Sequence, residues 1–403
     1  MKKILLLGGS AQQVVAIETA KRLGYYTVLC DFLEDNPGQY VADKFYLVST
    51  TDREAVLKVA KKENIDGVIA YASDPAAPTA AYVAEVMGLF GNPLESVEIL
   101  CNKGKFREFL KDNNFCAPNA KGYFDTEAAE LDIKNGIYAL PVIIKPVDSS
   151  GSKGVTVVYN LADLSEAIHN AFSFSRSHRV IVEEYIEKNH KYLIGGDIFV
   201  KNGKIVLWGL LNCHRDNTVN SLVPVGKSYP LMLAETDINT VKNTLQDIVE
   251  KLKISNGAMN VELVVDAMHR VWPIDIGPRN GGNMIPDLLG YIFGVDVVEM
   301  SVKTAMGEDF ECNLSGGEKY YATHNIHSTK DGVYKSIKLS DNIEKHIIKK
   351  YFYKSDGDSV EYFDNASKAL GIIFLKFDNK DIMSNILDNI NSHINIVLEE
   401  VTS

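Results

Sequence analysis

The sequence has no excess of positive charge, and this absence limits the partners that it can have. Its 403 residues include 42 Lys and Arg against 53 Asp and Glu, which gives a formal net charge of −11. Proteins that bind nucleic acid or acidic membranes through their overall charge normally show the opposite balance. We therefore expect no nucleic-acid or membrane partner, although a few placed cations can still bind a small anion.

Paired cysteines and long apolar runs are also missing. The five cysteines are odd in number, widely spaced and without a C-x-x-C pair, which argues against a disulfide framework and a zinc knuckle. The first apolar run, residues 4–7, stops at Gly8-Gly9 and is too short for a signal peptide, and no later run could span a bilayer. These features predict a cytoplasmic protein with reduced thiols.

The first hundred residues alternate short apolar runs with helical patterns. Residues 4–7, 27–30 and 67–71 predict strands, and residues 12–23 and 53–63 predict helices. Such alternation predicts a parallel sheet covered on both faces, with ligands at the carboxyl ends of its strands. Residues 8–10, Asp31 and residues 73–78 form that edge. The first turn lacks the third glycine of G-x-G-x-x-G, so a tight turn is favoured over a dinucleotide site, and Asp31 is either a ribose ligand or a turn residue.

A strand followed by a small-residue loop comes after a helix predicted at residues 96–113. The strand, residues 140–146, carries Lys145, and the loop contains Ser149, Ser150, Gly151, Ser152 and Gly154. Because a second strand follows at residues 155–159, the loop is not a P-loop, which opens a helix. Backbone N–H groups of a Gly/Ser loop can close on phosphate oxygens while a nearby lysine adds charge. An ordinary surface hairpin is the alternative interpretation.

Two further segments carry acidic residues on predicted strands. Residues 180–186 form a strand ending in Glu183 and Glu184, which can offer a purine a hinge of carboxylate or carbonyl acceptors and N–H donors. Residues 260–266 and 272–279 predict a hairpin that brings Glu262 opposite Asp275. Facing carboxylates repel unless a cation lies between them, and oxygen ligands favour Mg²⁺. A solvated strand residue is the alternative for either acid.

The order of these features resembles the ATP-grasp superfamily, and the resemblance covers nearly the whole chain. It implies an α/β and α+β fold in three parts: a Rossmann-like leading domain at residues 1–97, a two-lobed ATP-grasp core at 98–309 with its lid lobe at about 120–185, and a small C-terminal α+β domain at 310–403. The ligands implied by the resemblance are ATP and Mg²⁺, with Mn²⁺ as an alternative.

The resemblance also assigns a role to each motif. It implies that Lys103, after Asn102, reaches the α-phosphate, and that Lys145 and the loop at residues 149–154 hold the outer phosphates. The implied adenine hinge comprises Glu183, Glu184, Tyr185 and Ile186, the implied metal ligands are Glu262 and Asp275, and the implied catalytic residues are Lys145 and Arg279.

Three positions depart from the family pattern. Asn102 stands where the family has the aspartate before Lys103, which leaves the implied role of the lysine unchanged. Gly277 stands where the family has an asparagine ligand, so either one metal is held less fully or Asn280 or Asn283 contributes instead. The glutamate that normally binds the ribose is missing, and Asp197 is the candidate substitute.

The function implied by the resemblance is an ATP-dependent, ADP-forming ligase. The γ-phosphate is transferred to a carboxylate, and an amine or a thiol attacks the acyl phosphate. Candidate substrate residues are His214 and Arg215, between a strand at residues 205–211 and a turn-rich segment at 221–230, together with Asn280, Asn283 and a wall at residues 73–79. Alternatives are a bicarbonate-using carboxylase, which would need an external acceptor because no biotin-attachment sequence is present, and a non-catalytic ATP sensor. A homodimer is a candidate assembly.

The remaining chain predicts a small closing domain. Residues 320–327, 332–339 and 371–377 carry strand patterns, and residues 381–396 predict a closing helix.

Overall fold

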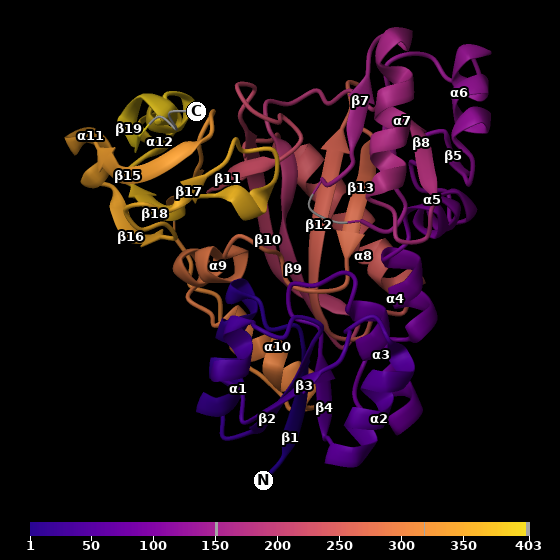
Figure 1. Cartoon of the computed structure of the whole chain (residues 1–403), viewed down its shortest axis with the longest axis vertical. Helices are drawn as coiled ribbons and strands as arrows, with labels where there is room; N and C mark the ends of the chain where they lie inside the picture. The colour runs from indigo at the N-terminus through magenta and orange to yellow at the C-terminus, as the bar shows by residue number, and fades with distance from the viewer. Residues whose placement is uncertain (150–151, 318, 400–403) are drawn as a thin grey trace.

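The computed structural model of the chain describes residues 1–149, 152–317 and 319–399. Figure 1 shows the leading part of the chain at the bottom, a lobe with α6 and α7 at the upper right, and the C-terminal part at the upper left. In the described residues no helix is both long and apolar enough to cross a membrane.

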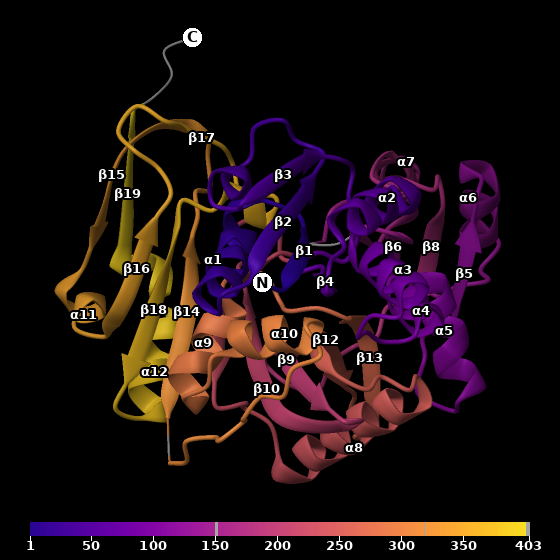
Figure 2. The same ribbon diagram turned by 90° about the horizontal axis from the view of Figure 1, so that it is seen from below.

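The leading part contains the predicted parallel sheet, with the strand order β3-β2-β1-β4. Helices α2 and α3 cover one face, and α1 covers the other together with the distant helix α10. Figure 2 shows α10 lying beside α1 under this sheet. The elements are β1 (Lys3–Leu7), α1 (Val14–Arg22), β2 (Tyr26–Asp31), β3 (Lys44–Leu47), α2 (Arg53–Glu63), β4 (Gly67–Ile69) and α3 (Ala77–Met87).

The long helix predicted at residues 96–113 is wrong, because the chain forms two helices there. These are α4 (Leu94–Leu100) and α5 (Lys103–Asp112). Asn102 has an extended backbone, and its side chain accepts a hydrogen bond from Lys105 N at 3.1 Å. An asparagine at this position starts a new helix by satisfying one of its free N–H groups. The break places Lys103 in the first turn of α5.

The lid lobe is an antiparallel sheet with the order β5-β8-β6-β7, covered by two helices. Its core forms where Val142, Ile144 and Val182 pack against Ala167 and Ile168 of α7. The elements are β5 (Ala120–Tyr123), α6 (Thr126–Lys134), β6 (Val142–Pro146), β7 (Thr156–Val158), α7 (Leu164–Ser173) and β8 (Val180–Glu184).

An eight-stranded antiparallel sheet forms the centre of the molecule, in the order β13-β12-β9-β10-β11-β14-β18-β16. One face packs on α8, and the other packs on α9, where Leu288 and Leu289 meet Leu207 and Leu211. The elements are β9 (Leu193–Lys201), β10 (Lys204–Arg215), β11 (Pro224–Tyr229), α8 (Glu235–Lys251), β12 (Gly257–Val265), β13 (Val271–Gly277), α9 (Ile285–Phe293) and α10 (Val297–Ala305).

The C-terminal part shares this central sheet and adds a smaller one, in the order β17-β15-β19. The predicted boundary at residue 310 stays a prediction, and the central sheet continues across it through β14, β18 and β16. The closing helix predicted at residues 381–396 is too long, because α12 ends at Asp388 and the chain then forms β19. The elements are β14 (Tyr320–Ile326), β15 (Gly332–Leu339), α11 (Asp341–Glu344), β16 (Ile347–Phe352), β17 (Ser359–Val360), β18 (Gly371–Phe377), α12 (Lys380–Asp388) and β19 (Ile394–Glu399).

Candidate active site

A cavity of about 1160 Å³ lies between the central sheet, the lid lobe, the leading part and the C-terminal part. Its lining includes fourteen of the residues named from the sequence: Lys103, Lys145, Ser149, Ser152, Glu183, Glu184, Tyr185, Ile186, His214, Arg215, Glu262, Asp275, Arg279 and Asn283. Ser150 and Gly151 lie outside the described residues. Segments up to 180 residues apart in the sequence thus meet around one space.

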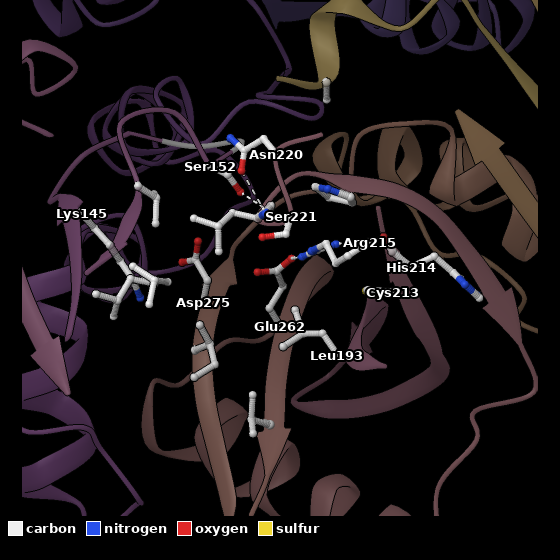
Figure 3. A pocket seen from close by; sticks show the side chains of 18 of the residues that line it. Lys145, Ser152, Leu193, Cys213, His214, Arg215, Asn220, Ser221, Glu262 and Asp275 are labelled. Carbon is white, nitrogen blue, oxygen red and sulfur yellow. Dashed lines mark hydrogen bonds and ion pairs between the residues drawn. The ribbon is translucent and has the colours of Figure 1, made fainter. Parts of the chain in front are cut away.

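Glu262 and Asp275 are register partners on the neighbouring strands β12 and β13. Figure 3 shows their carboxylates pointing into the same space, with Lys145 on one side and Arg215 and His214 on the other. Burial raises the pKa of Asp275, and the nearby Asp74 and Glu262 carboxylates raise it further. Among the described residues no third His, Cys, Asp or Glu completes a metal cluster with this pair. Two oxygen donors whose charges repel fit a hard divalent cation such as Mg²⁺.

Gly277, which replaces the family's asparagine, leaves room for Asp74 of the leading part. A Cβ atom at position 277 would lie 2.4 Å from Asp74 Oδ1. The Asp74 carboxylate instead accepts two hydrogen bonds from Arg279, one of them from Nε at 2.7 Å. Arg279 Nη1 also donates to the carbonyl oxygen of Asn280 at 3.0 Å. The absence of a side chain at residue 277 therefore lets the leading part hold Arg279 beside the carboxylate pair.

Lys145 belongs to a buried ion triad with Glu183 and Arg107. Lys145 Nζ donates to Glu183 Oε2 at 2.6 Å, and Arg107 donates to the two Glu183 oxygens at 2.9 and 3.2 Å. Burial alone would raise the pKa of Glu183, but Arg107 and Lys145 outweigh it and lower the pKa to about 2. The Glu183 carboxylate is therefore occupied by two cations, and the expectation that it accepts a purine amine is wrong.

The remainder of the expected hinge follows directly after this triad. Glu184 N donates to the Asn119 carbonyl oxygen at 2.9 Å, and strand β8 ends at Glu184, so the chain passes along the cavity at Tyr185 and Ile186. Apolar side chains surround this end of the cavity, including Ile143, Val157 and Ile274. Apolar side chains beside the backbone that follows β8 are suited to a planar heterocycle.

Ser149 and Ser152, from the described parts of the small-residue loop, line the cavity. Lys103 Nζ donates to the Ser149 carbonyl oxygen at 2.7 Å, and Ser152 Oγ donates to the Leu222 carbonyl oxygen at 2.9 Å. Gly154 does not line the cavity. It has φ +70°, and a Cβ atom there would lie 2.8 Å from Phe174 Cβ, so this glycine allows the loop to turn against α7.

His214 and Arg215 lie on β10, whose strand is longer than predicted, and the segment predicted to be turn-rich contains strand β11. The Nε2 atom of His214 lies 2.8 Å from Ser228 Oγ. Burial lowers the pKa of His214 to about 3. Arg215 Nη2 lies 3.4 Å from Glu262 Oε1. His214 is therefore a neutral hydrogen-bonding group, and Arg215 is a cation beside the carboxylate pair.

Asn280 and Asp197 do not occupy the roles expected of them. Asn280 is buried and lines a separate small cavity, where its Oδ1 accepts from Ser301 Oγ at 2.9 Å. Asp197 is fully buried and accepts from Gly281 N and Asn260 Nδ2, both at 2.8 Å. Neither side chain can reach a ligand in the main cavity, so both expectations are wrong.

The carboxyl edge of the leading sheet contributes fewer of the predicted residues to the main cavity than expected. The Asp31 carboxylate accepts from Gly9 N at 2.7 Å and Leu33 N at 2.8 Å, as an ordinary turn residue does. From the predicted wall at residues 73–79, Asp74 lines the main cavity.

Sequence reasoning missed three cavity or support residues: Asp74 as a partner of Arg279, Arg107 in the buried triad, and Lys227 on β11. Each is an isolated charge within an unremarkable stretch. The contacts of Arg107 and Asp74 join residues 76 and 205 positions apart, and that of Lys227 lies on a neighbouring strand, so no local pattern indicates them.

Comparison with known proteins identifies the same family that the order of the motifs resembles. Residues 138–287 match the ATP-grasp domain family. A formate-dependent phosphoribosylglycinamide formyltransferase of Prochlorococcus marinus (strain NATL2A) is 33% identical over 189 residues, which is 46% of this chain and 48% of that protein. The chain thus spans about half the length of these curated relatives.

Two solved structures share the fold over nearly the full chain. An L-amino acid ligase from Bacillus licheniformis has a TM-score of 0.82 at 18% identity, covering 99% of both chains. A phosphoribosylglycinamide synthetase from Anaerococcus prevotii has a TM-score of 0.76 at 24% identity, covering 99% of this chain and 100% of that one. The match identifies residues 138–287 as similar to an ATP-grasp domain, and the solved structures share the fold. The resemblance that the order of the motifs predicted is thereby confirmed.

Proposed function

We propose that the chain is an ATP-dependent, ADP-forming ligase acting on a small-molecule carboxylate. The γ-phosphate passes to the carboxylate, and an amine or a thiol then attacks the acyl phosphate and releases phosphate. The observation that carries the proposal is the facing pair Glu262 and Asp275 in one cavity with Lys145 and Arg279. Phosphoryl transfer requires this collection of charges because negative charge is spread over the transferring group.

The nucleotide is proposed to bind between the lid lobe and the central sheet. Tyr185 and Ile186 offer backbone groups beside apolar side chains, while Lys103 and Lys145 lie toward the carboxylate pair. This order matches the order of adenine and phosphates in a nucleotide, and a single ligand would span it.

Glu262 and Asp275 would hold Mg²⁺, or Mn²⁺ in its place, through oxygen ligands. The ion would neutralise phosphate charge when bound. The chain itself contributes the Lys145 ammonium and the Arg279 guanidinium, each oriented by a carboxylate before any ligand arrives. Residues 149–154 would exclude water from the acyl phosphate.

The size of the cavity favours two organic ligands. Pockets for one small molecule typically measure about 300–1,000 Å³, and this cavity measures about 1160 Å³. A cavity of this size has room for a nucleotide together with a carboxylate and its acceptor.

ADP release tests the proposal. The purified chain is incubated with ATP and Mg²⁺ and with pairs drawn from amino acids, dicarboxylates, bicarbonate and amines. We expect ADP formation that depends on a carboxylate and falls at least a hundredfold in Lys145→Met, while Lys349→Met on the exposed strand β16 matches the wild type. ATP binding without turnover in every combination would favour the non-catalytic sensor.

The metal assignment has a separate test. Electron paramagnetic resonance of Mn²⁺ measures metal binding to the chain with ADP, independently of turnover. Glu262→Gln and Asp275→Asn should each weaken Mn²⁺ binding at least tenfold. Wild-type Mn²⁺ affinity in both variants would show that the ion is held elsewhere.

A further inference from the structure

Cys213 and Lys227 bring a thiol and an amine together at the wall of the main cavity. They are register partners on the antiparallel strands β10 and β11. The nitrogen of Lys227 lies 2.6 Å from the sulfur of Cys213, and both residues line the cavity. Figure 3 shows Cys213 among the side chains drawn around this space. A nucleophilic sulfur and a nitrogen are therefore in direct contact beside the space proposed for ligands.

The contact between the two side chains is closer than the pairing of their strands requires. The Cβ atoms of directly paired residues lie about 5 Å apart. A lysine has a long flexible stem that normally carries its charge into water. Lys227 instead folds back over its cross-strand partner, where it is 6% exposed and Cys213 is 1% exposed. The surrounding packing thus holds the nitrogen against the sulfur.

Gly195 on the neighbouring strand β9 makes room for both atoms. A Cβ atom at residue 195 would lie 2.4 Å from Cys213 Sγ and 3.2 Å from Lys227 Nζ. A glycine at such a place allows side chains to approach the backbone closely. The sulfur and the nitrogen therefore share one niche over bare backbone, with no side chain from β9 between them.

Lys227 also acts on the buried carboxyl group of Asp197. Burial raises the pKa of Asp197 to about 6, and Arg279 and Lys227 are among the groups that lower it. The charge of Lys227 is therefore part of the electrostatics of the sheet. A reaction that removed this charge would change the environment of Asp197 as well.

The separation of the nitrogen from the sulfur selects one kind of covalent link. A distance of 2.6 Å is too long for a direct nitrogen–sulfur bond, and it is the span of one oxygen atom bonded to both. Peroxide supplies such an oxygen, because it converts a cysteine to a sulfenic acid. Sulfenic acids then react with a neighbouring thiol or nitrogen. At Cys213 the neighbour is the nitrogen of Lys227.

We propose that Cys213 and Lys227 form a reversible S–O–N bridge when the chain meets hydrogen peroxide. In the first step the sulfur attacks one peroxide: an S–O bond forms, the O–O bond breaks, and water leaves a sulfenic acid. The ammonium of Lys227 next releases a proton to water. A second peroxide then takes one hydrogen from the nitrogen and one from the S–O–H group, and leaves as two waters while the N–O bond forms. Sulfur and nitrogen each lose two electrons, and each peroxide gains two.

Peptide mass spectrometry of the full chain tests the bridge. The chain is reduced, freed of reductant, treated with hydrogen peroxide and digested with trypsin, which cleaves at Arg215, between the two residues. We expect two linked peptides whose mass exceeds the sum of the separate peptides by one oxygen less two hydrogens, and which dithiothreitol separates. Cys213→Ser and Lys227→Arg should each lower the yield of this product at least tenfold. Cys116→Ser, at a half-buried cysteine elsewhere, should match the wild type.

Trapping of the sulfenic acid gives a second readout. Dimedone, which reacts with sulfenic acids, should label Cys213 at least threefold more in Lys227→Arg than in the wild type, because the arginine does not complete the bridge. Equal labelling in the two proteins would show that Lys227 does not capture the oxidised sulfur. The linked peptides of the wild type are measured without any substitution, so the proposal stays testable where a variant does not fold.

Three other results would overturn the inference. The first is the absence of linked peptides from the oxidised wild type. The second is a linked product without the added oxygen, which would be a direct nitrogen–sulfur bond. The third is a Cys213 that proceeds to sulfinic or sulfonic acid while Lys227 stays unmodified. Because the bridge is independent of the proposed ligase function and none of these results depends on ADP release, failure of either proposal is distinguishable from failure of the other.

Discussion

Glu183→Gln replaces the buried carboxylate between Arg107 and Lys145 by a neutral amide of the same size. The wild-type side chain is 1% exposed and accepts three charged hydrogen bonds. The variant keeps both cations buried and removes their shared negative charge. Because an amide also has one donor face, one of the two cations must lose its acceptor.

The size of the effect follows from the pKa of Glu183. An ordinary glutamate has a pKa of 4.5, and the folded protein lowers that of Glu183 to about 2. This difference corresponds to about 3 kcal/mol of stability. The pKa is lowered on folding, so the contribution is fully present above pH 4.5 and is lost as the pH falls from 4.5 toward 2. Breaking buried ion pairs costs about 3–5 kcal/mol in other proteins, which agrees with this value.

Urea unfolding of the wild type and Glu183→Gln at pH 7 and at pH 3 measures this contribution. We expect the variant to lose about 3 kcal/mol at pH 7 and to differ much less from the wild type at pH 3. Glu184→Gln, an exposed position on the same strand, is the matched control and should stay within about 0.5 kcal/mol of the wild type. A variant as stable as the wild type at pH 7, or an equal deficit at both pH values, would refute the role of the triad.

Three further perturbations have defined outcomes. Gly277→Asn restores the family's residue but places a Cβ atom 2.4 Å from Asp74 Oδ1. The variant should therefore form ADP at least tenfold more slowly than the wild type. Activity equal to or above that of the wild type would contradict the steric argument. Gly281→Ala brings a Cβ atom to 2.6 Å from a buried carboxylate oxygen and should cost about 1–3 kcal/mol in urea unfolding, whereas Gly316→Ala, at an open position, should change little. Burial lowers the pKa of His324 from 6.5 to about 3, so the folded state binds fewer protons and stability falls as the pH drops below 6.5. Between pH 7 and pH 5, His324→Gln should lose about 2 kcal/mol less of its free energy of unfolding than the wild type. If the free energy of unfolding of the variant depends on pH as that of the wild type does, His324 is not the cause of the loss.

Local patterns predicted the elements that carry the expected motifs. The helix at residues 53–63 and the strand at 371–377 have the predicted bounds, because apolar spacing and capping residues act over a few positions. The hairpin that pairs Glu262 with Asp275 was predictable for the same reason. The breaks at Asn102 and Asp388 were missed, although the asparagine at residue 102 is a local helix-starting signal.

The partners of charged side chains were predicted less well than the helices and strands. Glu183 on strand β8 was expected to contact a ligand, and the structure pairs it with Arg107 of helix α5. Asp197 was expected at the ribose, and it lies beneath the backbone of Gly281 instead. Each partner is distant in sequence, and no periodicity links the two.

The sequence by itself indicated the family resemblance, through a lysine and a small-residue loop between two strands and through two acids on facing strands. These features depend on short-range backbone geometry, which local residues dictate. Tertiary structure decided which charges are free to meet a ligand. Gly277 departs from the family pattern, and Asp74 fills the space that a side chain there would occupy. Gly195 opens the space into which Lys227 reaches. The reason is physical: charge compensation and steric room are set by distances in space, and strands far apart along the chain supply both.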